Sequence, residues 1–560
     1  MADWKSKARE HVSEVNALIP KEWLIPGTIP SADDQRDVTG YIRQFLTARE
    51  IDITEVDAAS IVANIASGAW KAKEVTEAFC HRAALAHQLV HCLHEIFFEA
   101  AIADAERLDD YFEKKGKTLG PLHGLPVSLK DQFHVKGVES TMGYVGWLGT
   151  FQGKKDTGKD KVFESEMVRE LRELGAVLYV KTSLPQTLIS GETFNNFIGY
   201  TNNPHNRHLA AGGSSGGEGA LIALRGSPVG FGTDIAGSVR MPASANGIYT
   251  IKPSANRLPI SDLATSMDGQ NTIMASIGPL ATSIPAMRLV FRSLLAAKPW
   301  LYDPQVVELP YRDELELETR ELAKGQLVFG IMEHDGVVTP HPPVARAIEI
   351  VRSAIEKLGH KAVKWSPPAH IRAVEILVNA LQYDGGLDVH NSFSLSGERV
   401  YPQIKGLYGE KPKDTQWTAS EIAANNVRSR EYQKEYLDYW NSTATITGTG
   451  RPVDAWILPA APFTAARPGR YDYYGYTMIA NVVDYTTAVI PVTVADKDVD
   501  VKNATYQAFN DIDRKVWDSY DAEIYHGAPV AVQIVGRRFE EEKILVLAEI
   551  LDKAIGKTEV

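Results

Sequence analysis

Short apolar runs alternate with helical patterns of apolar positions from about residue 54 to the end of the chain. The runs are rich in β-branched residues, which is typical of buried strands, whereas apolar positions three and four apart indicate helices. We expect strands at residues 127–129, 177–180, 229–231, 248–251, 327–331, 361–365, 456–458, 488–494 and 530–535. We expect helices from residue 54 and at residues 73–91, 99–114, 165–174, 219–224, 344–358 and 540–555. Strands mixed with helices over this length favour a large α/β sandwich.

The chain divides into a polar start and one long domain. Residues 1–50 are polar and carry prolines at positions 20, 26 and 30, so we expect an N-terminal arm that wraps a larger body. We expect that body to span residues 51–560 as one domain. Within it, residues 366–450 are helix-rich, polar and aromatic, which fits an insertion or a lid.

Composition and charge indicate which kinds of partner, such as nucleic acid or a membrane, the protein is expected to lack. The 560 residues are 44% apolar and 23% charged, which is ordinary for a globular protein. The net charge of −12 argues against nucleic acid as the main partner. The start of the chain lacks the apolar core of a signal peptide, and no stretch approaches the roughly 18 apolar residues of a membrane span. We therefore expect a soluble, cytoplasmic protein.

Cysteine and histidine provide no recognisable metal site. The two cysteines, Cys80 and Cys92, exclude a disulfide framework and form no Cys-x-x-Cys pair. The fifteen histidines form no His-Glu-x-x-His motif. His94 and Glu95 begin such a pattern, but Phe98 occupies the place of the second histidine. We expect no bound metal.

A glycine-rich segment at residues 212–219 contains Ser214 and leads into a helix-forming run. Glycines that open a helix bring free N–H donors and the positive end of the helix dipole to a ligand. A phosphate loop would need Gly-Lys-Ser/Thr and a dinucleotide loop Gly-x-Gly-x-x-Gly, and neither is present. Two alternatives stay open. One is a flexible linker; the other is a Gly-x-Ser-x-Gly nucleophile elbow, although loop-like residues 203–208 stand where its strand belongs.

A second glycine-rich turn, residues 232–240, follows a short apolar strand and contains Ser238, 24 residues after Ser214. A nest of backbone N–H groups in such a turn can bind an oxyanion. Asp234 and Arg240 could hold the turn by an ion pair, and that role would also suit a plain turn between strand and helix. The N–H groups that we expect to converge on one point belong to Ile235, Ala236, Gly237 and Ser238.

Lys130 ends the apolar run of residues 124–130. A lysine at a strand end is usually a solvated charge. To act as a base it must be neutral, which requires a pKa well below the usual value of about 10.4. Burial among apolar neighbours or the positive ends of helices would lower the pKa in that way. A serine that attacks a carbonyl needs a base and an oxyanion site, and these three segments could supply both without a histidine.

Together these segments closely resemble the amidase signature family. The matching motifs are Gly-Leu-Pro-Val-Ser-Leu-Lys130-Asp, Gly-Gly-Ser214-Ser-Gly-Gly and Gly-Thr-Asp-Ile-Ala-Gly-Ser238-Val-Arg. The spacing between the serines is the family's own, and the three motifs in order are far more specific than any one. The similarity runs from about residue 50 to the C-terminus. The outer segments look most like those of fungal acetamidases and general amidases, and the core is also similar to fatty acid amide hydrolase. The resemblance implies one α/β/α sandwich around a twisted, mixed sheet.

The resemblance also implies a Ser–cis-Ser–Lys triad. Ser238 matches the family nucleophile, and Lys130 matches the base. Ser214 matches the bridging serine, which follows a cis peptide bond, and Gly213 before it makes that geometry sterically easier. Ser215 is expected to support the network by hydrogen bonding.

Two further positions concern the substrate. Residues 183–188 match a loop that lines the substrate site in the family, with Leu188 as the expected contact. Ala236 departs from the pattern, because many relatives have glycine there. If that residue needs a positive φ, alanine would be strained. Otherwise its methyl group would narrow the pocket near the acyl carbonyl.

We therefore predict hydrolysis of a carboxylic acid amide to the acid and ammonia or an amine through a seryl acyl-enzyme, with no cofactor. Neutral Lys130 would take a proton from Ser214, which would take one from Ser238. The loop N–H groups would hold the oxyanion. The expected partner is a small-molecule amide, and homodimers are common in this family.

Three alternatives remain. A glutaminase subunit of an amidotransferase shares the triad but works with partner chains, and the acetamidase-like outer segments disfavour it. An α/β-hydrolase-type esterase would use Ser214 as the nucleophile. A non-catalytic protein could use the nest to bind an anion, although the intact triad argues against that.

Overall fold

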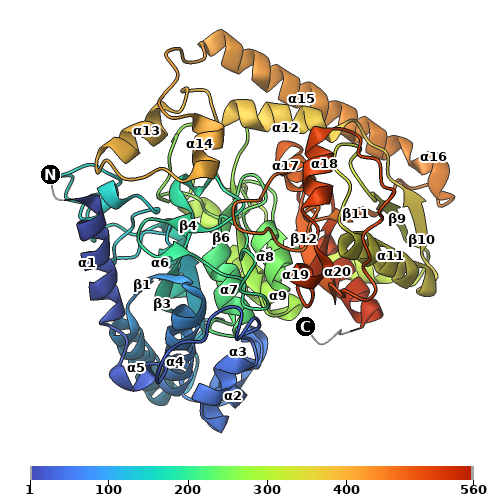
Figure 1. Ribbon diagram of the computed structural model, residues 1–560. Helices are drawn as coiled ribbons and strands as arrows, with labels where there is room; N and C mark the ends of the chain where they lie inside the picture. Colours follow the sequence, from blue (N-terminus) through green and yellow to red (C-terminus); the bar gives the residue numbers. More distant parts are fainter. Residues whose placement is uncertain (1–2, 557–560) are drawn as a thin grey trace.

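A mixed β-sheet forms the centre of the molecule in the computed structural model, which describes residues 3–556 (Figure 1). In the described chain this sheet has eleven strands, in the order β1-β3-β2-β6-β8-β7-β12-β13-β11-β9-β10. They are β1 (Leu93–Ile96), β2 (Pro126–Lys130), β3 (Val177–Thr182), β6 (Val229–Asp234), β7 (Tyr249–Lys252), β8 (Ser276–Ala281), β9 (Val328–Ile331), β10 (Lys361–Lys364), β11 (Ala455–Pro459), β12 (Thr487–Val494) and β13 (Pro529–Val535). A separate small hairpin pairs β4 (Phe194–Asn195) with β5 (Gly199–Tyr200).

Helices flank the sheet. In the first half they are α1 (Trp4–Asn16), α2 (Ala48–Thr54), α3 (Ala58–Ala66), α4 (Ala72–Val90), α5 (Phe98–Lys115), α6 (Glu166–Glu173), α7 (Gly216–Ala223), α8 (Arg240–Asn246) and α9 (Ile284–Ala296). In the second half they are α10 (Asp313–Leu322), α11 (Pro342–Lys357), α12 (His370–Ala380), α13 (Leu387–Ser394), α14 (Pro402–Tyr408), α15 (Ala419–Ser442), α16 (Ala444–Thr447), α17 (Gly475–Val482), α18 (Asp511–Asp518), α19 (Ala522–Tyr525) and α20 (Glu541–Ile555). Short 3₁₀ turns are η1 (Lys21–Trp23), η2 (Tyr41–Phe45), η3 (Val145–Trp147), η4 (Gln186–Leu188) and η5 (Pro299–Leu301).

The sheet is buried on both faces, as expected for a sandwich. Alternate residues of a strand point to opposite faces. On β11, Ala455 and Ile457 belong to one hydrophobic cluster, whereas Trp456 and Leu458 belong to a second. The first cluster also contains residues of α4, α9, α11 and α20, and the second contains residues of α12, α15 and α17. The predicted α/β sandwich with a mixed sheet is therefore confirmed.

Each strand predicted from the sequence is present with ends that agree within three residues, but β1 and β8 of the large sheet and the short strands β4 and β5 were not predicted. β8 reads Ser-Ile-Gly-Pro-Leu-Ala, and a proline argues against a central strand because it cannot donate to the ladder. Nevertheless β8 lies between β6 and β7, with Pro279 opposite Phe231. β1 is only four residues long and includes His94 and Glu95, so its apolar signal is weak.

Residues 3–50 contain more regular structure than the sequence indicated, because α1 was not predicted. α1 packs beside β1, where His11 Nε2 lies 2.7 Å from Glu95 Oε1. Residues 366–450 contain α12 to α16, and Figure 1 shows α12 and α15 running along the top of the molecule. Whether this segment acts as a lid stays a prediction. Within residues 3–556, no helix has both the length and the apolar character that crossing a bilayer requires.

The two strands that carry the predicted chemistry are neighbours. β2 and β6 run parallel, with Ser128 opposite Gly230 and Leu129 opposite Phe231. Their carboxyl ends therefore meet at one edge of the sheet, which is where open α/β sheets bind ligands. Lys130 is the last residue of β2, and Asp234 is the last residue of β6.

Candidate active site

The three segments singled out in the sequence meet at one cavity. Lys130 ends β2, the loop after β6 carries Ser238, and Ser214 precedes α7. Ser214 and Ser238 both line a cavity of about 470 Å³. The serines are almost fully buried, so the site is shielded from bulk water.

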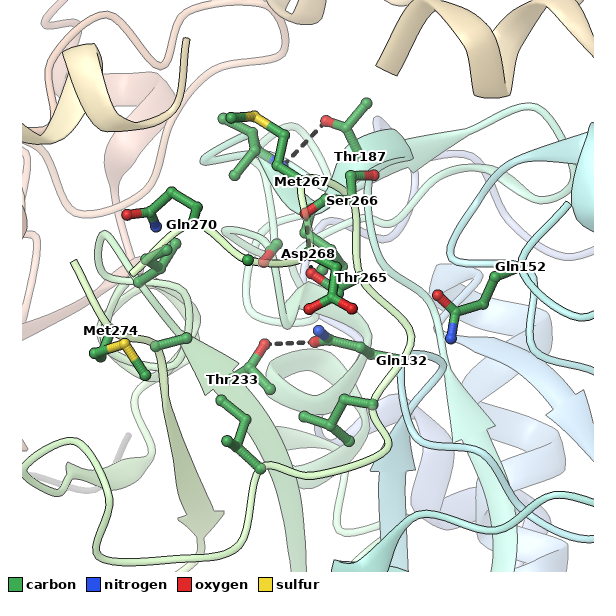
Figure 2. A pocket seen from close by; sticks show the side chains of 18 of the residues that line it. Gln132, Gln152, Thr187, Thr233, Thr265, Ser266, Met267, Asp268, Gln270 and Met274 are labelled. Atoms are coloured by element: carbon green, nitrogen blue, oxygen red, sulfur yellow. Dashed lines mark hydrogen bonds between the residues drawn. The ribbon is translucent and has the colours of Figure 1, made fainter. Parts of the chain in front are cut away.

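Lys130 is completely buried and touches two hydroxyl groups. Its Nζ lies 2.7 Å from Ser214 Oγ and 3.1 Å from Thr233 Oγ1. Thr233 donates its own proton to Gln132 Oε1 at 2.7 Å, which Figure 2 shows as a dashed line, so Thr233 accepts from Lys130. Burial lowers the pKa of Lys130 to about 7, although the charges of Asp234 and Glu218 oppose that shift. Lys130 can therefore be neutral near physiological pH, as a base must be.

The Ser214 loop has the geometry that the family resemblance implied. The peptide bond between Gly213 and Ser214 is cis. A side chain at Gly213 would collide with the carbonyl oxygen of Ser190, so glycine is required by close approach. Ser215 differs from the expectation. Its backbone N–H donates to the carbonyl of Ser238 at 3.1 Å, but its hydroxyl has no hydrogen-bond partner among residues 3–556. The backbone of Ser215, not its side chain, ties the two serine loops together.

The Ser238 loop offers fewer free donors than predicted. Gly237 N–H donates to Asp234 Oδ1 at 2.8 Å and is thus already occupied. Gly237 has a φ of +122°, and a side chain there would collide with Thr477. The Gly237 N–H is therefore not free in this structure, and the role of the four N–H groups at an oxyanion stays a prediction. Of the four N–H groups of residues 235–238, those of Ile235, Ala236 and Ser238 have no acceptor within the described chain.

The predicted ion pair between Asp234 and Arg240 is present and completely buried. Arg240 Nη2 lies 3.0 Å from Asp234 Oδ1, and Arg240 Nε lies 3.1 Å from Asp234 Oδ2. The Arg240 guanidinium and hydrogen bonds hold the pKa of Asp234 well below its usual range, against the opposing effect of burial. Sequence reasoning missed two partners of this pair, Asn481 and Gln533, which bind Arg240 at 2.6 and 2.7 Å. They come from α17 and β13, and no local motif marks them.

Ala236 neither strains the backbone nor narrows the cavity, although both effects were considered from the sequence. It is not among the residues with positive φ, so alanine is unstrained there. Its carbonyl accepts a hydrogen bond of 2.6 Å from Thr477 Oγ1. Ala236 belongs to the second hydrophobic cluster, and it is absent from the lining of the cavity within the described chain. Its methyl group therefore does not narrow the cavity, which corrects the expectation from sequence.

Leu188 lines the cavity, as expected, in a strained backbone conformation. Thr187 and Leu188 have φ values of 67° and 66°, which are unfavourable for residues with side chains. Such strain persists only where surrounding structure enforces it, and it concentrates at functional sites. Figure 2 shows Thr187 at the top of the pocket, across from Gln132 and Thr233. The strained turn therefore forms part of the wall of the cavity that Ser214 and Ser238 also line.

The cavity wall combines apolar, neutral polar and charged side chains, the charged ones being Lys159, Asp262 and Asp268. Apolar contacts come from Ile235, Leu263, Ile273 and Leu381, which belong to four separate segments. Figure 2 shows Gln152, Gln270, Met267 and Met274 around the same space. At one side, Lys159 stands over the rings of Phe151 and Phe163, 5.2 and 4.8 Å from their centroids. This arrangement suits a ligand that has both apolar and polar parts.

One cluster of ligand-type side chains lies outside the cavity. Atoms of His94, Glu95 and Asp131 lie within 4.8 Å of one another. The two carboxylates already have partners, because Lys181 Nζ is 2.8 Å from Asp131 Oδ1 and His11 is bonded to Glu95. An ammonium group at that position would repel a cation. The two carboxylates are therefore paired in a buried ion-pair network.

An α/β sheet with a buried lysine and two serines at one cavity defines a class of hydrolytic enzyme. The family model described as Amidase matches residues 74–545, which is most of the chain. The chain therefore belongs to the amidase family and is an amide-hydrolysing enzyme.

Individual relatives agree with this assignment. The chain is 45% identical to an acetamidase of Aspergillus oryzae (strain ATCC 42149 / RIB 40), over 99% of both chains. It is 42% identical to an acetamidase of Emericella nidulans, over 99% of this chain and 98% of that one. Among solved structures, fatty acid amide hydrolase superimposes with a TM-score of 0.90 at 30% identity, covering 99% of this chain and 96% of that chain.

Proposed function

We propose that the chain hydrolyses amides through an acyl-enzyme on Ser238, with Ser214 relaying a proton to Lys130. The observation that carries the proposal is the contact of 2.7 Å between Lys130 Nζ and Ser214 Oγ in a fully buried site. A buried lysine with a pKa of about 7 can accept a proton, and a serine bonded to it is the natural donor. Ser238 shares the cavity and supplies a second hydroxyl.

The proposed reaction has two halves. In the first, Lys130 takes the proton of Ser214, Ser214 takes that of Ser238, and Ser238 Oγ attacks the amide carbonyl. The proton then returns through Ser214 to the leaving nitrogen as the C–N bond breaks. In the second half, water attacks the ester by the same proton route and releases the acid. The Ser238 hydroxyl makes no hydrogen bond within residues 3–556, and catalytic bonds often tighten only when substrate binds.

The unoccupied N–H groups of the Ser238 loop are the proposed oxyanion donors. Ile235, Ala236 and Ser238 have backbone donors without internal acceptors in the described chain. Asp234 holds the loop by accepting from Gly237 and Val239, so the free donors are oriented before substrate arrives. Such preorganised donors stabilise developing negative charge by about 3–4 kcal/mol each.

The nucleophile-elbow alternative is disfavoured by two features. In the described chain, residues 203–212 form a loop with an isolated bridge instead of a strand leading into Ser214. The base beside Ser214 is a lysine, whereas that elbow requires a histidine. For the glutaminase alternative, full-length similarity to two acetamidases is the opposing observation, and we propose that the chain acts without an amidotransferase partner.

Replacement of the proposed nucleophile tests the mechanism. Ser238→Ala should reduce kcat for amide hydrolysis by roughly 10⁴-fold or more and abolish labelling by a fluorophosphonate, because the acyl-enzyme cannot form. Ser244→Ala is a matched control, since Ser244 is a buried serine of α8 that does not line the cavity. Amide turnover that survives Ser238→Ala in a correctly folded protein would overturn the proposal.

A further inference from the structure

A buried carboxyl group lies beneath the proposed base and has no assigned task. Glu218, in the first turn of α7, is completely buried. Its Oε2 lies 2.6 Å from Ser128 Oγ on β2, and its Oε1 lies 2.8 Å from Thr182 Oγ1 on β3. Thr182 is the register partner of Lys130, so the carboxyl group reaches the strand segment that carries the base. Among residues 3–556 no cation forms an ion pair with Glu218.

Counting hydroxyl protons assigns the protonation state of this carboxyl group. Ser227 Oγ lies 2.8 Å from the carbonyl of Val229, which can only accept, so Ser227 donates there. Ser128 Oγ lies 2.9 Å from Ser227 Oγ, and only Ser128 has a proton left for that bond. Ser128 then has no proton for its contact of 2.6 Å with Glu218, so Oε2 must carry one. Thr182 completes the pattern by donating to Oε1.

We infer that Glu218 is a neutral carboxylic acid in the resting enzyme and acts as a positioning residue that keeps Lys130 an uncharged base. The chain of bonds from Glu218 through Ser128 and Ser227 to the Val229 carbonyl holds the acid proton away from Lys130. The protonation state follows from geometry alone. The consequence for Lys130 rests on the proposed function.

Electrostatics gives the reason why the neutral state matters. An ionised Glu218 would favour the ammonium form of Lys130, and an ammonium group cannot accept a proton from Ser214. Burial raises the pKa of Glu218 to about 7, and the hydroxyl donors and Lys130 oppose that rise. The two groups therefore share one proton in two arrangements of equal net charge, both neutral or both charged, and they titrate as a pair.

The remaining titratable groups around the pair are few. Asp234, at the end of β6, acts on Lys130 but is itself paired with Arg240. Cys92 and Tyr179 face Glu218, and burial raises the pKa of each, so both are uncharged near neutral pH. Glu218 and Lys130 are thus the groups whose charge can change there.

Infrared difference spectroscopy tests the protonation state directly. The difference between the wild type and Glu218→Gln at neutral pH should show loss of the carbonyl stretch of a protonated carboxylic acid. Glu541→Gln is the matched control, because Glu541 is equally buried but paired with Arg257, which lowers its pKa. Loss of an ionised-carboxylate band in Glu218→Gln would overturn the inference. This measurement needs no turnover, so it stands even if the Ser238 mechanism fails.

Kinetics tests the link to Lys130. Glutamine mimics the neutral acid. Glu218→Gln should therefore keep the plateau of kcat/KM at high pH within about threefold of the wild-type value, and the acidic limb of the kcat/KM profile should move to lower pH. A loss of more than about 100-fold would show that the carboxylate charge is required. Should Glu218→Gln not fold, Ser227→Ala frees the Ser128 proton for Glu218. Ser227→Ala should then weaken the carbonyl band of protonated Glu218 and move the acidic limb of the kcat/KM profile to higher pH. An unchanged band would contradict the inference.

Discussion

At the scale of single residues, burial converts Lys130 from an ordinary cation into a candidate base. An exposed lysine stays protonated far above neutral pH, whereas this side chain is completely enclosed by β2, the Ser214 loop and Thr233. Loss of hydration destabilises the charged form. The two hydroxyl contacts remain equally available to a neutral amine, because Ser214 can donate to its lone pair while Thr233 accepts from it.

The pH dependence of turnover follows from that burial. The base is active when neutral, and its pKa is about 7, so kcat/KM should rise as pH rises through about 7 and level off above it. The measurement is kcat/KM against pH for a neutral amide substrate. Lys130→Met should lose most activity, and the activity that remains should increase with hydroxide concentration. A wild-type profile that is flat between pH 5 and about 9 would contradict this assignment.

At the scale of elements, one buried turn organises the proposed oxyanion loop. Asp234 accepts from two backbone N–H groups of its own turn and pairs with Arg240, while Asn481 adds a bond of 2.9 Å from α17. Arg240 in turn reaches Gln533 on β13. The loop between β6 and α8 is thus fixed by side chains from four elements, β6, α8, α17 and β13, and its free donors are held in place without help from substrate.

Neutralising that carboxylate should destabilise the protein. Asp234→Asn leaves the buried Arg240 charge without an oppositely charged partner, so we expect a loss of about 3–5 kcal/mol in unfolding free energy. The pKa of Asp234 is lower in the folded state than in the unfolded state. Asp234 therefore stabilises the fold above its unfolded pKa of about 3.9, and this stabilisation is lost as the pH falls from there toward the folded-state pKa. Denaturant unfolding at pH 7 and pH 3 measures both effects. Equal stability of the two proteins at pH 7 would contradict the prediction.

At the scale of the whole molecule, the first fifty residues belong to the main hydrophobic core. Val15, Ile19, Ile25, Val38 and Ile42 are all buried in the cluster that includes α4 and β3. Burying one such side chain contributes about 1.5–3 kcal/mol, so five together approach the total stability of a typical domain.

A chain that begins at residue 48 should therefore not fold cooperatively. Thermal unfolding followed by circular dichroism would show a broad or absent transition. Leu18→Ala in the full chain is the control, because Leu18 is 53% exposed and its truncation should change little. A truncated chain with the unfolding temperature of the full protein would mean that residues 1–47 are a dispensable arm.

The cavity, whose wall is assembled from segments far apart in the chain, sets an upper limit on the size of the substrate. A volume of about 470 Å³ falls in the range of roughly 300–1,000 Å³ typical of pockets for drug-sized ligands, far more than an acetyl group needs. Each methylene buried there contributes about 0.8 kcal/mol, so kcat/KM should rise about fourfold per added carbon in a short series of unbranched amides. The test is the series from acetamide to hexanamide. A steady fall along it would show that the cavity excludes longer acyl groups.

Local chemistry allowed much of this protein to be predicted from sequence. The strands that end at Lys130 and Asp234, the helix after the Ser214 loop and the ion pair of Asp234 with Arg240 all lie within short segments. Patterns of period two and 3.6, together with the spacing of motifs, are properties of adjacent residues. β8 escaped prediction because its glycine and proline contradict the local pattern, and its place between β6 and β7 depends on neighbours.

The amino-acid sequence by itself therefore determined which residues are proposed to carry the chemistry and most of the strands and helices around them. Tertiary structure alone decided their state. It buried Lys130 until its pKa fell to about 7, directed the Gly237 N–H to Asp234, and brought Asn481 and Gln533 to Arg240 from distant elements. It also placed Glu218 under the base, in a bond chain that requires a proton. Desolvation and hydrogen-bond partners depend on what surrounds a group in space, and residues far apart in the sequence supply those surroundings.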